Sequence, residues 1–134
     1  MLENRPELAG RLDEDLVGWL TTVTPSGQPQ SSVVWYLRHG DDLLVYSKPD
    51  ATKLANIASN PKVAFNLRGD PEADMVATFE ATATIVERPT PAHEDAAYLT
   101  KYRSQIERLG WTPEEFAADY STLIRLRLDR IRAW

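Results

Sequence analysis

The sequence predicts a mainly β protein, a small antiparallel barrel whose open ends and edges are covered by helices. Short runs of β-branched and aromatic residues recur at short spacing and are joined by turn residues, which is typical of antiparallel strands. Segments with helical periodicity lie between and after these runs. The 134-residue chain, with 43% hydrophobic and 26% charged residues, has the size and composition of a single domain, residues 1–134.

The first third of the chain is expected to contain a short helix and three strands. Pro6, followed by leucines at positions 8, 12 and 16, predicts the helix. The turn residues Thr24-Pro25-Ser26-Gly27 and His39-Gly40-Asp41-Asp42 separate the predicted strands. These strands are expected at 17–23, 30–37 and 43–47. Their order predicts an antiparallel meander.

The middle of the chain is expected to contain a helix and two strands. Asp50 is expected to cap the helix, which runs to Asn60 and is ended by Pro61. A strand follows at 63–67. Polar and apolar residues alternate along 75–86, which makes this segment the longest candidate strand.

The C-terminal third is expected to contain two helices and a closing strand. The first helix begins at Thr90-Pro91 and continues to Leu109. Thr112-Pro113-Glu114-Glu115 forms a capping box with proline at the first helical position, which predicts a second helix to Tyr120. The strand is expected at 123–128. Three aromatic residues are expected to dock these helices on the barrel or, alternatively, to shape a substrate pocket: Tyr98, Tyr102 and Trp111.

Charge and hydropathy argue against nucleic acid and membranes as partners. Fifteen basic and twenty acidic residues give a net charge of -5, so the overall field repels nucleic acid. Arg125 and Arg127 alternate with leucines, as on the solvated face of a half-buried strand. No apolar run approaches the roughly 18 residues of a membrane span, and residues 1–10 do not resemble a signal peptide. A cytoplasmic location is therefore expected.

Several kinds of chemistry are excluded by residue type and spacing. The absence of cysteine excludes disulfides, thiolate metal sites and a cysteine nucleophile. The six glycines are too scattered for a dinucleotide-binding fingerprint or a phosphate-binding P-loop. His39 and His93 are not spaced as metal ligands, so no metal site is expected.

One segment has the residues expected of a phosphate site. Lys48 and Lys53 surround a predicted helix start, where cations are normally disfavoured. Together with the hydroxyl groups of Ser47 and Thr52 and the free N–H groups of the first helical turn, they predict a phosphate-binding cradle. The alternative is that both lysines are solvated and Asp50 alone caps the helix.

Three motifs, in this order and spacing, carry a family resemblance over nearly the whole chain. They are 20–30 (LTTVTPSGQPQ) with the following Val33-Val34-Trp35-Tyr36; Tyr46-Ser47 with 52–57 (TKLANI) and 60–63 (NPKV); and 124–126 (IRL) with 130–134 (RIRAW). The chain resembles the split-barrel superfamily of pyridoxamine 5'-phosphate oxidase-like flavoproteins. It is more similar to the small actinobacterial branch that uses the deazaflavin coenzyme F420.

This resemblance implies a six-stranded antiparallel split β-barrel and a homodimer with two cofactor sites at the subunit interface. It implies that the protein is an oxidoreductase that transfers a hydride between reduced coenzyme F420 and a small electron-poor organic acceptor. The residues implied to flank the cofactor ring are Ser31, Ser32, Val33, Val34 and Trp35. The residues implied to hold the phosphate are Ser47, Lys48, Thr52 and Lys53. Burial of Trp134 across the dimer interface is also expected.

Trp35 has an alternative role. Trp35 and Tyr36 are expected on one strand and so face opposite ways, which leaves at most one of them to pack against a flat ring. The alternative for Trp35 is that it fills the barrel core or the dimer core.

Two departures from the family pattern bear on the cofactor. Ala51 and Thr52 stand where the FMN-dependent oxidases place a serine and an arginine, so one anchor for the FMN phosphate is missing. Glu80-Ala81 stands where the family has Glu-Gly, which affects either a bulge or a close cofactor approach. FMN binding by a flavin reductase or oxidase remains the alternative. A non-catalytic carrier of coenzyme F420 or of haem is the third possibility, the haem ligand being a histidine, a tyrosine, Met1 or Met75.

Overall fold

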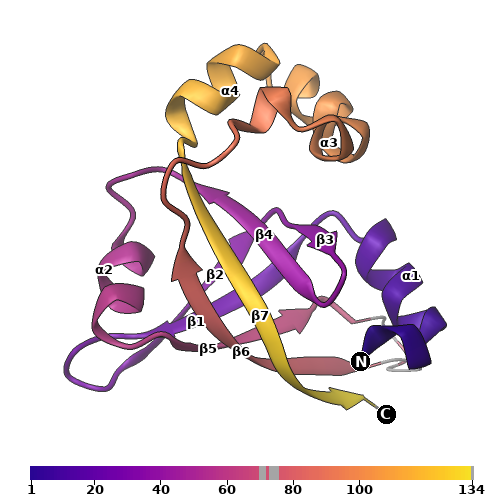
Figure 1. The fold of residues 1–134 in the computed structure, drawn as a ribbon, viewed down its shortest axis with the longest axis vertical. Coiled ribbons are helices and arrows are strands. Elements are labelled where there is room, and N and C mark those ends of the chain that lie inside the picture. The colour runs from indigo at the N-terminus through magenta and orange to yellow at the C-terminus, as the bar shows by residue number, and fades with distance from the viewer. Residues whose placement is uncertain (70–71, 73–75, 134) are drawn as a thin grey trace.

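Within the described residues, 1–69, 72 and 76–133, the computed structural model contains seven antiparallel strands in one sheet that curls into a split barrel (Figure 1). The strands are β1 (Gly18–Val23), β2 (Pro29–Val34), β3 (Leu37–His39), β4 (Asp42–Ser47), β5 (Lys62–Leu67), β6 (Ala77–Ile85) and β7 (Thr122–Ala133). Their order across the sheet is β2-β1-β5-β6-β7-β4-β3. The predicted fold class, a mainly β split barrel with flanking helices, is confirmed.

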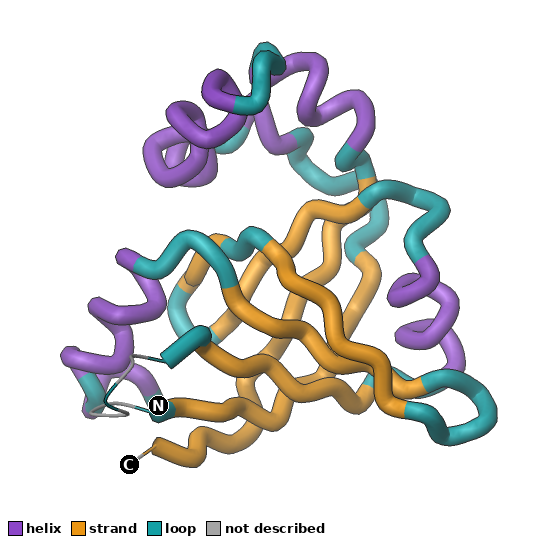
Figure 2. The backbone as a smooth tube through the Cα atoms, turned by 180° about the vertical axis from the view of Figure 1, so that it is seen from behind, coloured by secondary structure: helices purple, strands orange, loops and turns teal. Residues whose placement is uncertain are grey.

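Helices lie around this sheet in three places. The helices and 3₁₀ turns are η1 (Leu2–Asn4), α1 (Pro6–Glu14), α2 (Thr52–Ser59), η2 (Ala92–Glu94), α3 (Ala96–Arg108) and α4 (Pro113–Asp119). Helices α1 and α2 flank the barrel, while α3 and α4 cover one end (Figures 1 and 2). Residues 92–120 are called the helical insert below. In the described part of the chain, no helix has both the length and the apolar character needed to span a membrane.

Alternation of side chains along the strands builds the barrel interior. In β6, Phe79, Ala81 and Ala83 are buried in the interior, and the residues between them face outward, as predicted. By alternation Ile85 belongs to the same face as Phe79, but it is 38% exposed. A second buried cluster lies between β4 and the helical insert and includes Tyr98. The insert therefore has a core of its own against the end of the sheet.

The β6–β7 ladder has a bulge at Glu80-Ala81, which was one of the two alternatives for this departure from the family pattern. Glu80 pairs with Arg130 and Ala81 with Leu128, which leaves Asp129 without a partner across the ladder. The Asp129 carboxylate accepts hydrogen bonds from Thr82 Oγ1 at 2.6 Å and from Arg127 Nε at 2.9 Å. These bonds hold the extra residue, and they keep the pKa of Asp129 below its usual range.

Two strand predictions were wrong. The segment 30–37 is not one strand but ends as β2 at Val34 and resumes as β3, which raises the strand number from six to seven. The last strand runs to Ala133, well beyond Leu128, because every residue of β6 has a partner in it, and the pairing extends to Ala133. The start predicted for β6 at Met75 lies outside the described residues.

The helix signals were confirmed in part. The capping box at Thr112 is present, with Glu115 N–H donating to Thr112 Oγ1 at 3.1 Å. The helix expected from Thr90 instead begins with the short turn η2. Helix α3 then starts after Asp95, whose carboxylate accepts a hydrogen bond from the Tyr98 N–H at 3.1 Å.

Candidate functional site

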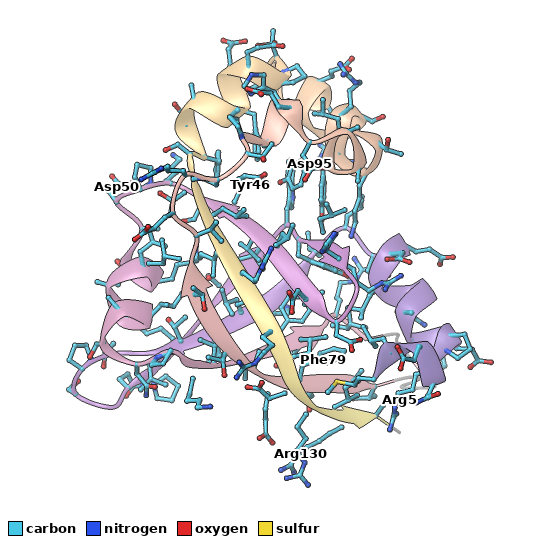
Figure 3. All side chains as sticks on the ribbon, viewed as in Figure 1. Arg5, Tyr46, Asp50, Phe79, Asp95 and Arg130 are labelled. Atoms are coloured by element: carbon cyan, nitrogen blue, oxygen red, sulfur yellow. The ribbon has the colours of Figure 1, made fainter. Side chains whose placement is uncertain are left out.

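A cavity of about 560 Å³ lies between the end of the barrel and the helical insert. Its barrel side comes from β2, β4 and the start of α2, and its other side comes from α3, α4 and the loop between them. Figure 3 shows Tyr46 of β4 between the sheet and the insert. The lining residues are Val33, Val34, Trp35, Tyr46, Ser47, Lys48, Ala51, Lys53, Tyr98, Leu109, Trp111, Phe116 and Tyr120.

The structure brings most of the predicted cofactor residues to this cavity. Those that line it are Val33, Val34, Trp35, Ser47, Lys48 and Lys53. Three do not line it: Ser31, Ser32 and Thr52. Ser31 is exposed on β2, where its Oγ lies 2.7 Å from Thr21 Oγ1 on β1. The cavity thus joins residues of β2 with residues of the β4–α2 connection, which lie more than ten positions further along the sequence.

The start of α2 differs from its prediction in one respect. The cap position is occupied by Ala51 and not by Asp50, and no side chain caps the helix. Asp50 is exposed in the preceding turn, with its position shown in Figure 3. Because Ala51 has no acceptor, the first N–H groups of α2 lack the side-chain partner that a helix start usually has. This end of α2 is therefore suited to an anion.

Lys53 lies in the first turn of α2 and lines the cavity. It is half-buried, and it makes no hydrogen bond or ion pair with any residue that the structure describes. Partial burial without a counter-ion lowers the pKa of its ammonium group. An anionic ligand beside the ammonium group would offset this unfavourable burial of its charge.

Asn56 fixes α2 against the sheet. Its buried amide donates to Thr22 Oγ1 and to Gln30 Oε1, both at 3.0 Å. These bonds link α2 to β1 and β2 and so hold the helix start that carries Lys53 at the cavity.

The other predicted phosphate ligands differ in how accessible they are. Ser47 is 2% exposed, and its hydroxyl donates to the Lys48 carbonyl oxygen at 3.0 Å. Lys48 is exposed, with its Nζ 5.7 Å from the centre of the Tyr120 ring. Lys48 therefore lies between the start of α2 and the helical insert.

The break between β2 and β3 is held by α3. The Tyr36 N–H donates to the Tyr102 hydroxyl at 2.8 Å, and the Tyr36 carbonyl oxygen accepts from Lys101 Nζ at 2.9 Å. Lys101 Nζ also donates to the Leu12 carbonyl oxygen at 3.2 Å. Burial lowers the pKa of Lys101 to about 8. At this break, side chains of α3 thus make the hydrogen bonds to the Tyr36 backbone that a neighbouring strand would otherwise make.

This break directs Trp35 toward the insert. Trp35 stacks on Tyr102, with ring centres 4.8 Å apart, and on Phe116 at 5.5 Å. Tyr36 instead lies in the barrel core, fully buried. Trp35 does not fill the barrel core, so that part of the alternative was wrong, and its place in a dimer core stays a prediction. The two residues do face different cores.

The aromatic side of the cavity was only partly predicted. Tyr98 and Trp111 line it, as the pocket alternative proposed, whereas Tyr102 packs behind Trp35. Phe116 and Tyr120 were not predicted, although five aromatic residues between 98 and 120 are a signal that was available in the sequence. Their rings stack on each other with centres 4.6 Å apart.

Histidine ligands for haem do not reach the cavity, whereas tyrosines do. No group of three or more potential ligands suited to a metal ion occurs among residues 1–69, 72 and 76–133. Neither His39 nor His93 lines the cavity, and nor does Met1. Met75 lies outside the described residues. Tyrosines are the potential haem ligands that do line it.

Comparisons with known proteins agree with the fold. A search of curated proteins found no significant match. A conserved hypothetical protein from Mycobacterium tuberculosis has a similar solved structure, with 24% identity, a TM-score of 0.78, and coverage of 96% of this chain and 82% of that one. An F420 reductase shows 26% identity and a TM-score of 0.69, covering 92% and 94%. The heme storage protein from Vibrio cholerae shows 22% identity and a TM-score of 0.66, covering 96% and 92%.

The family assignment rests on a match to nearly the whole chain. The family model described as pyridoxamine 5'-phosphate oxidase matches residues 5–134, which include every strand and the complete lining of the cavity. Its members include oxidoreductases. The chain belongs to the pyridoxamine 5'-phosphate oxidase family.

Proposed function

We propose that this protein is an F420-dependent oxidoreductase that transfers a hydride between reduced coenzyme F420 and a small electron-poor organic acceptor. The observation that carries the proposal is Lys53, a half-buried cation with no partner among the described residues, beside an uncapped helix start at the edge of a cavity. Such a site fits an anionic group of a cofactor whose ring system occupies the adjoining space.

The residues fit this coenzyme in two groups. Lys48, Lys53 and the first N–H groups of α2 would hold the phosphate, with the hydroxyl groups of Ser47 and Thr52 beside them. The segment from Ser31 to Trp35 would flank the ring. The part of this segment from Val33 to Trp35 lines the cavity. The bound coenzyme would supply the hydride chemistry. The chain's own part is to orient the ring through Trp35 and to exclude water with the aromatic insert.

Coenzyme F420 is favoured over FMN by the same segment. Ala51 and Thr52 lack the charge that the arginine of FMN-dependent oxidases places before the lysine, so an FMN phosphate would have one anchor fewer here. The similarity to a solved F420 reductase supports this choice. FMN binding, with flavin reductase or oxidase activity, is the second candidate, because the cradle would also accept a phosphomonoester.

Side-by-side calorimetric titration with coenzyme F420 and with FMN tests the proposal. We expect micromolar or tighter binding of coenzyme F420 and binding of FMN that is weaker by about tenfold or more, since one charge-assisted contact is absent. A preference for FMN would assign the protein to the flavin-binding part of the family. Binding of neither, with a Soret band on addition of haem, would favour a haem-binding role.

We also propose that the protein is a homodimer whose cofactor sites lie at the interface. Trp19 and Val33 pair across β1 and β2 and are 44% and 50% exposed, which is unusual for two large apolar neighbours. Val33 also lines the cavity, so this exposed pair lies beside the proposed cofactor. A second copy of the chain would cover both. The expected contribution of Trp134 lies outside the described residues.

Replacing Trp19 with glutamate is expected to weaken dimerisation by about tenfold or more, because a charge would be placed in an apolar contact. Light scattering over a range of protein concentrations measures this change. Because Trp19 is exposed, we expect the secondary structure of the variant, measured by circular dichroism, to be the same as that of the wild type. A wild-type protein that is monomeric at micromolar concentration would contradict the proposal.

A further inference from the structure

The helical insert presents accessible apolar surface to the cavity. Leu109, at the end of α3, lines the cavity and is 55% exposed. Trp111 and Tyr120 also line the cavity and are partly exposed. A molecule that enters the cavity can therefore contact these three side chains. Covering exposed apolar surface is favourable, so this wall favours an apolar ligand.

A glycine turn brings Leu109 and Trp111 to the same cavity. Gly110 has a φ of 85°, the left-handed conformation in which many helices end. The Leu109 N–H donates to the Gln105 carbonyl oxygen at 3.2 Å. The Trp111 N–H donates to the Ile106 carbonyl oxygen, also at 3.2 Å. These bonds fix the backbone on both sides of the glycine, so the positions of both residues are set before a ligand binds.

The aromatic residues of this wall pack as one unit. Phe116 and Tyr120 stack with ring centres 4.6 Å apart, and Trp111 is tilted against them at 6.3 and 6.2 Å. Phe116 is only 5% exposed, so it supports the two more accessible rings from within the insert. Aromatic rings pack closely against other rings, and such a wall therefore matches a flat ligand. Because the Trp111 and Tyr120 centres are 6.2 Å apart, an extended flat ligand gains more of this contact than a single ring does.

Charge divides the cavity into two regions. Its cations, Lys48 and Lys53, come from the β4–α2 connection and the start of α2. Among the described residues, none that lines the cavity from the helical insert is charged. The cationic region suits the coenzyme phosphate, and the insert suits a neutral group. With the coenzyme ring against Val33–Trp35, hydride transfer requires the acceptor to lie in contact with that ring, which places it between the ring and the insert.

We propose that Leu109, Trp111 and Tyr120 form the acceptor subsite, and that this subsite takes flat, uncharged aromatic compounds with two or more fused rings. This inference rests on the proposed function, in which an acceptor lies beside the coenzyme. Leu109 determines specificity in the subsite, because its exposed side chain adds apolar contact that a fused ring system covers more fully than a single ring.

The binding of two ketones tests the proposal, with no coenzyme present. The probes are 2-acetylnaphthalene, which has two fused rings, and acetophenone, which carries the same acetyl group on one ring. We expect calorimetric titration to show that the wild type binds 2-acetylnaphthalene about tenfold more tightly, because this ketone covers more of the apolar wall. Leu109→Gln should weaken the binding of 2-acetylnaphthalene about fivefold and change that of acetophenone by less than about twofold.

Leu16→Gln is the matched control. Leu16 is also an exposed leucine, with 37% of its surface accessible, but it does not line the cavity. The same substitution at this position should leave the affinities for both ketones unchanged. Because both leucines are exposed, both variants should keep the secondary structure of the wild type, measured by circular dichroism.

The outcomes separate this inference from the proposed function. The acceptor subsite would be overturned if the wild type did not bind 2-acetylnaphthalene, if Leu109→Gln bound it as tightly as the wild type, or if Leu16→Gln lost as much affinity. Weaker dimerisation of Leu109→Gln in light scattering would also overturn it, because a second copy of the chain would then cover Leu109. Failure of coenzyme F420 to bind in its own titration would overturn the proposed function, and the ketone measurements would remain interpretable because they use no coenzyme.

Discussion

Replacing Lys53 with alanine is expected to weaken the binding of coenzyme F420 by about 1.5–3 kcal/mol, or roughly 10- to 150-fold. The variant loses a cation that faces the cavity and that has no other partner among the described residues. Its folding stability should be little changed, because the substitution removes no hydrogen bond or ion pair that the structure describes. Calorimetric titration of the coenzyme gives the affinity, and urea unfolding gives the stability.

Lys62→Ala is the matched control for this prediction. Lys62 is an exposed lysine at the start of β5, where its Nζ lies 3.3 Å from Thr82 Oγ1, and it does not line the cavity. Its removal takes away the same charge from the surface, so a general electrostatic effect would appear in both variants. An unchanged affinity in Lys53→Ala, or an equal loss in Lys62→Ala, would contradict the proposed phosphate site.

The pH dependence of coenzyme binding also tests whether the charged form of Lys53 holds the phosphate. Burial lowers the pKa of Lys53 in the ligand-free protein, so its ammonium group loses its proton below the usual pH range of a lysine. The charged form binds the anion, and affinity should therefore fall as the pH rises through this pKa. Lys53→Ala should lack that part of the decline, and the difference between the two titration series isolates it.

Replacing Gly18 with alanine is expected to lower the free energy of unfolding by about 1–3 kcal/mol, because it overpacks the barrel core. A Cβ atom at Gly18 would lie 2.2 Å from Cζ of Phe65, far inside van der Waals contact. Phe65 is fully buried and packs edge-on against Tyr36 at 4.9 Å and near Phe79 at 6.0 Å. Its ring therefore has little room to move. Urea unfolding followed by tryptophan fluorescence measures the change.

Gly10→Ala is the control with the opposite expected sign. Gly10 lies in the middle of α1, and a Cβ atom there would meet no heavy atom within 4 Å. The same chemical change should raise the free energy of unfolding by about 0.5–1 kcal/mol, because alanine favours the helix. A Gly18→Ala variant as stable as the wild type would show that Phe65 can move, contrary to the packing described here.

Local sequence patterns predicted most of the secondary structure because their causes are local. Alternation identified β6 and the capping box at Thr112 identified α4, since both depend on residues a few positions apart. The cap of α2 was placed at Asp50 instead of Ala51, a shift of one residue that changes the site. With Ala51 at the cap, the helix start has no carboxylate partner and is open to an external anion.

The break at Trp35-Tyr36 was not predictable in this way. The β-rich run continues to Leu37, so periodicity extends the strand through the break. The N–H and carbonyl groups of Tyr36 bond instead to Tyr102 and Lys101, which lie more than sixty residues away. Only long-range contacts decide where β2 ends and which way Trp35 faces.

The sequence by itself determined the fold class and the order of most elements, and it supplied the candidate residues of the proposed phosphate site, because periodicity, turn chemistry and charge at a helix start are properties of neighbouring residues. The tertiary structure alone decided which of these residues share a cavity. β2 and β4 lie near opposite edges in the sheet order, so it is the curling of the sheet that brings them together with α2, and packing of the helical insert adds Tyr98 and Phe116 as the opposite wall. It also left the Tyr98 hydroxyl without a partner in the part of the chain that the structure describes, a property that depends on every group around it and that no residue type encodes.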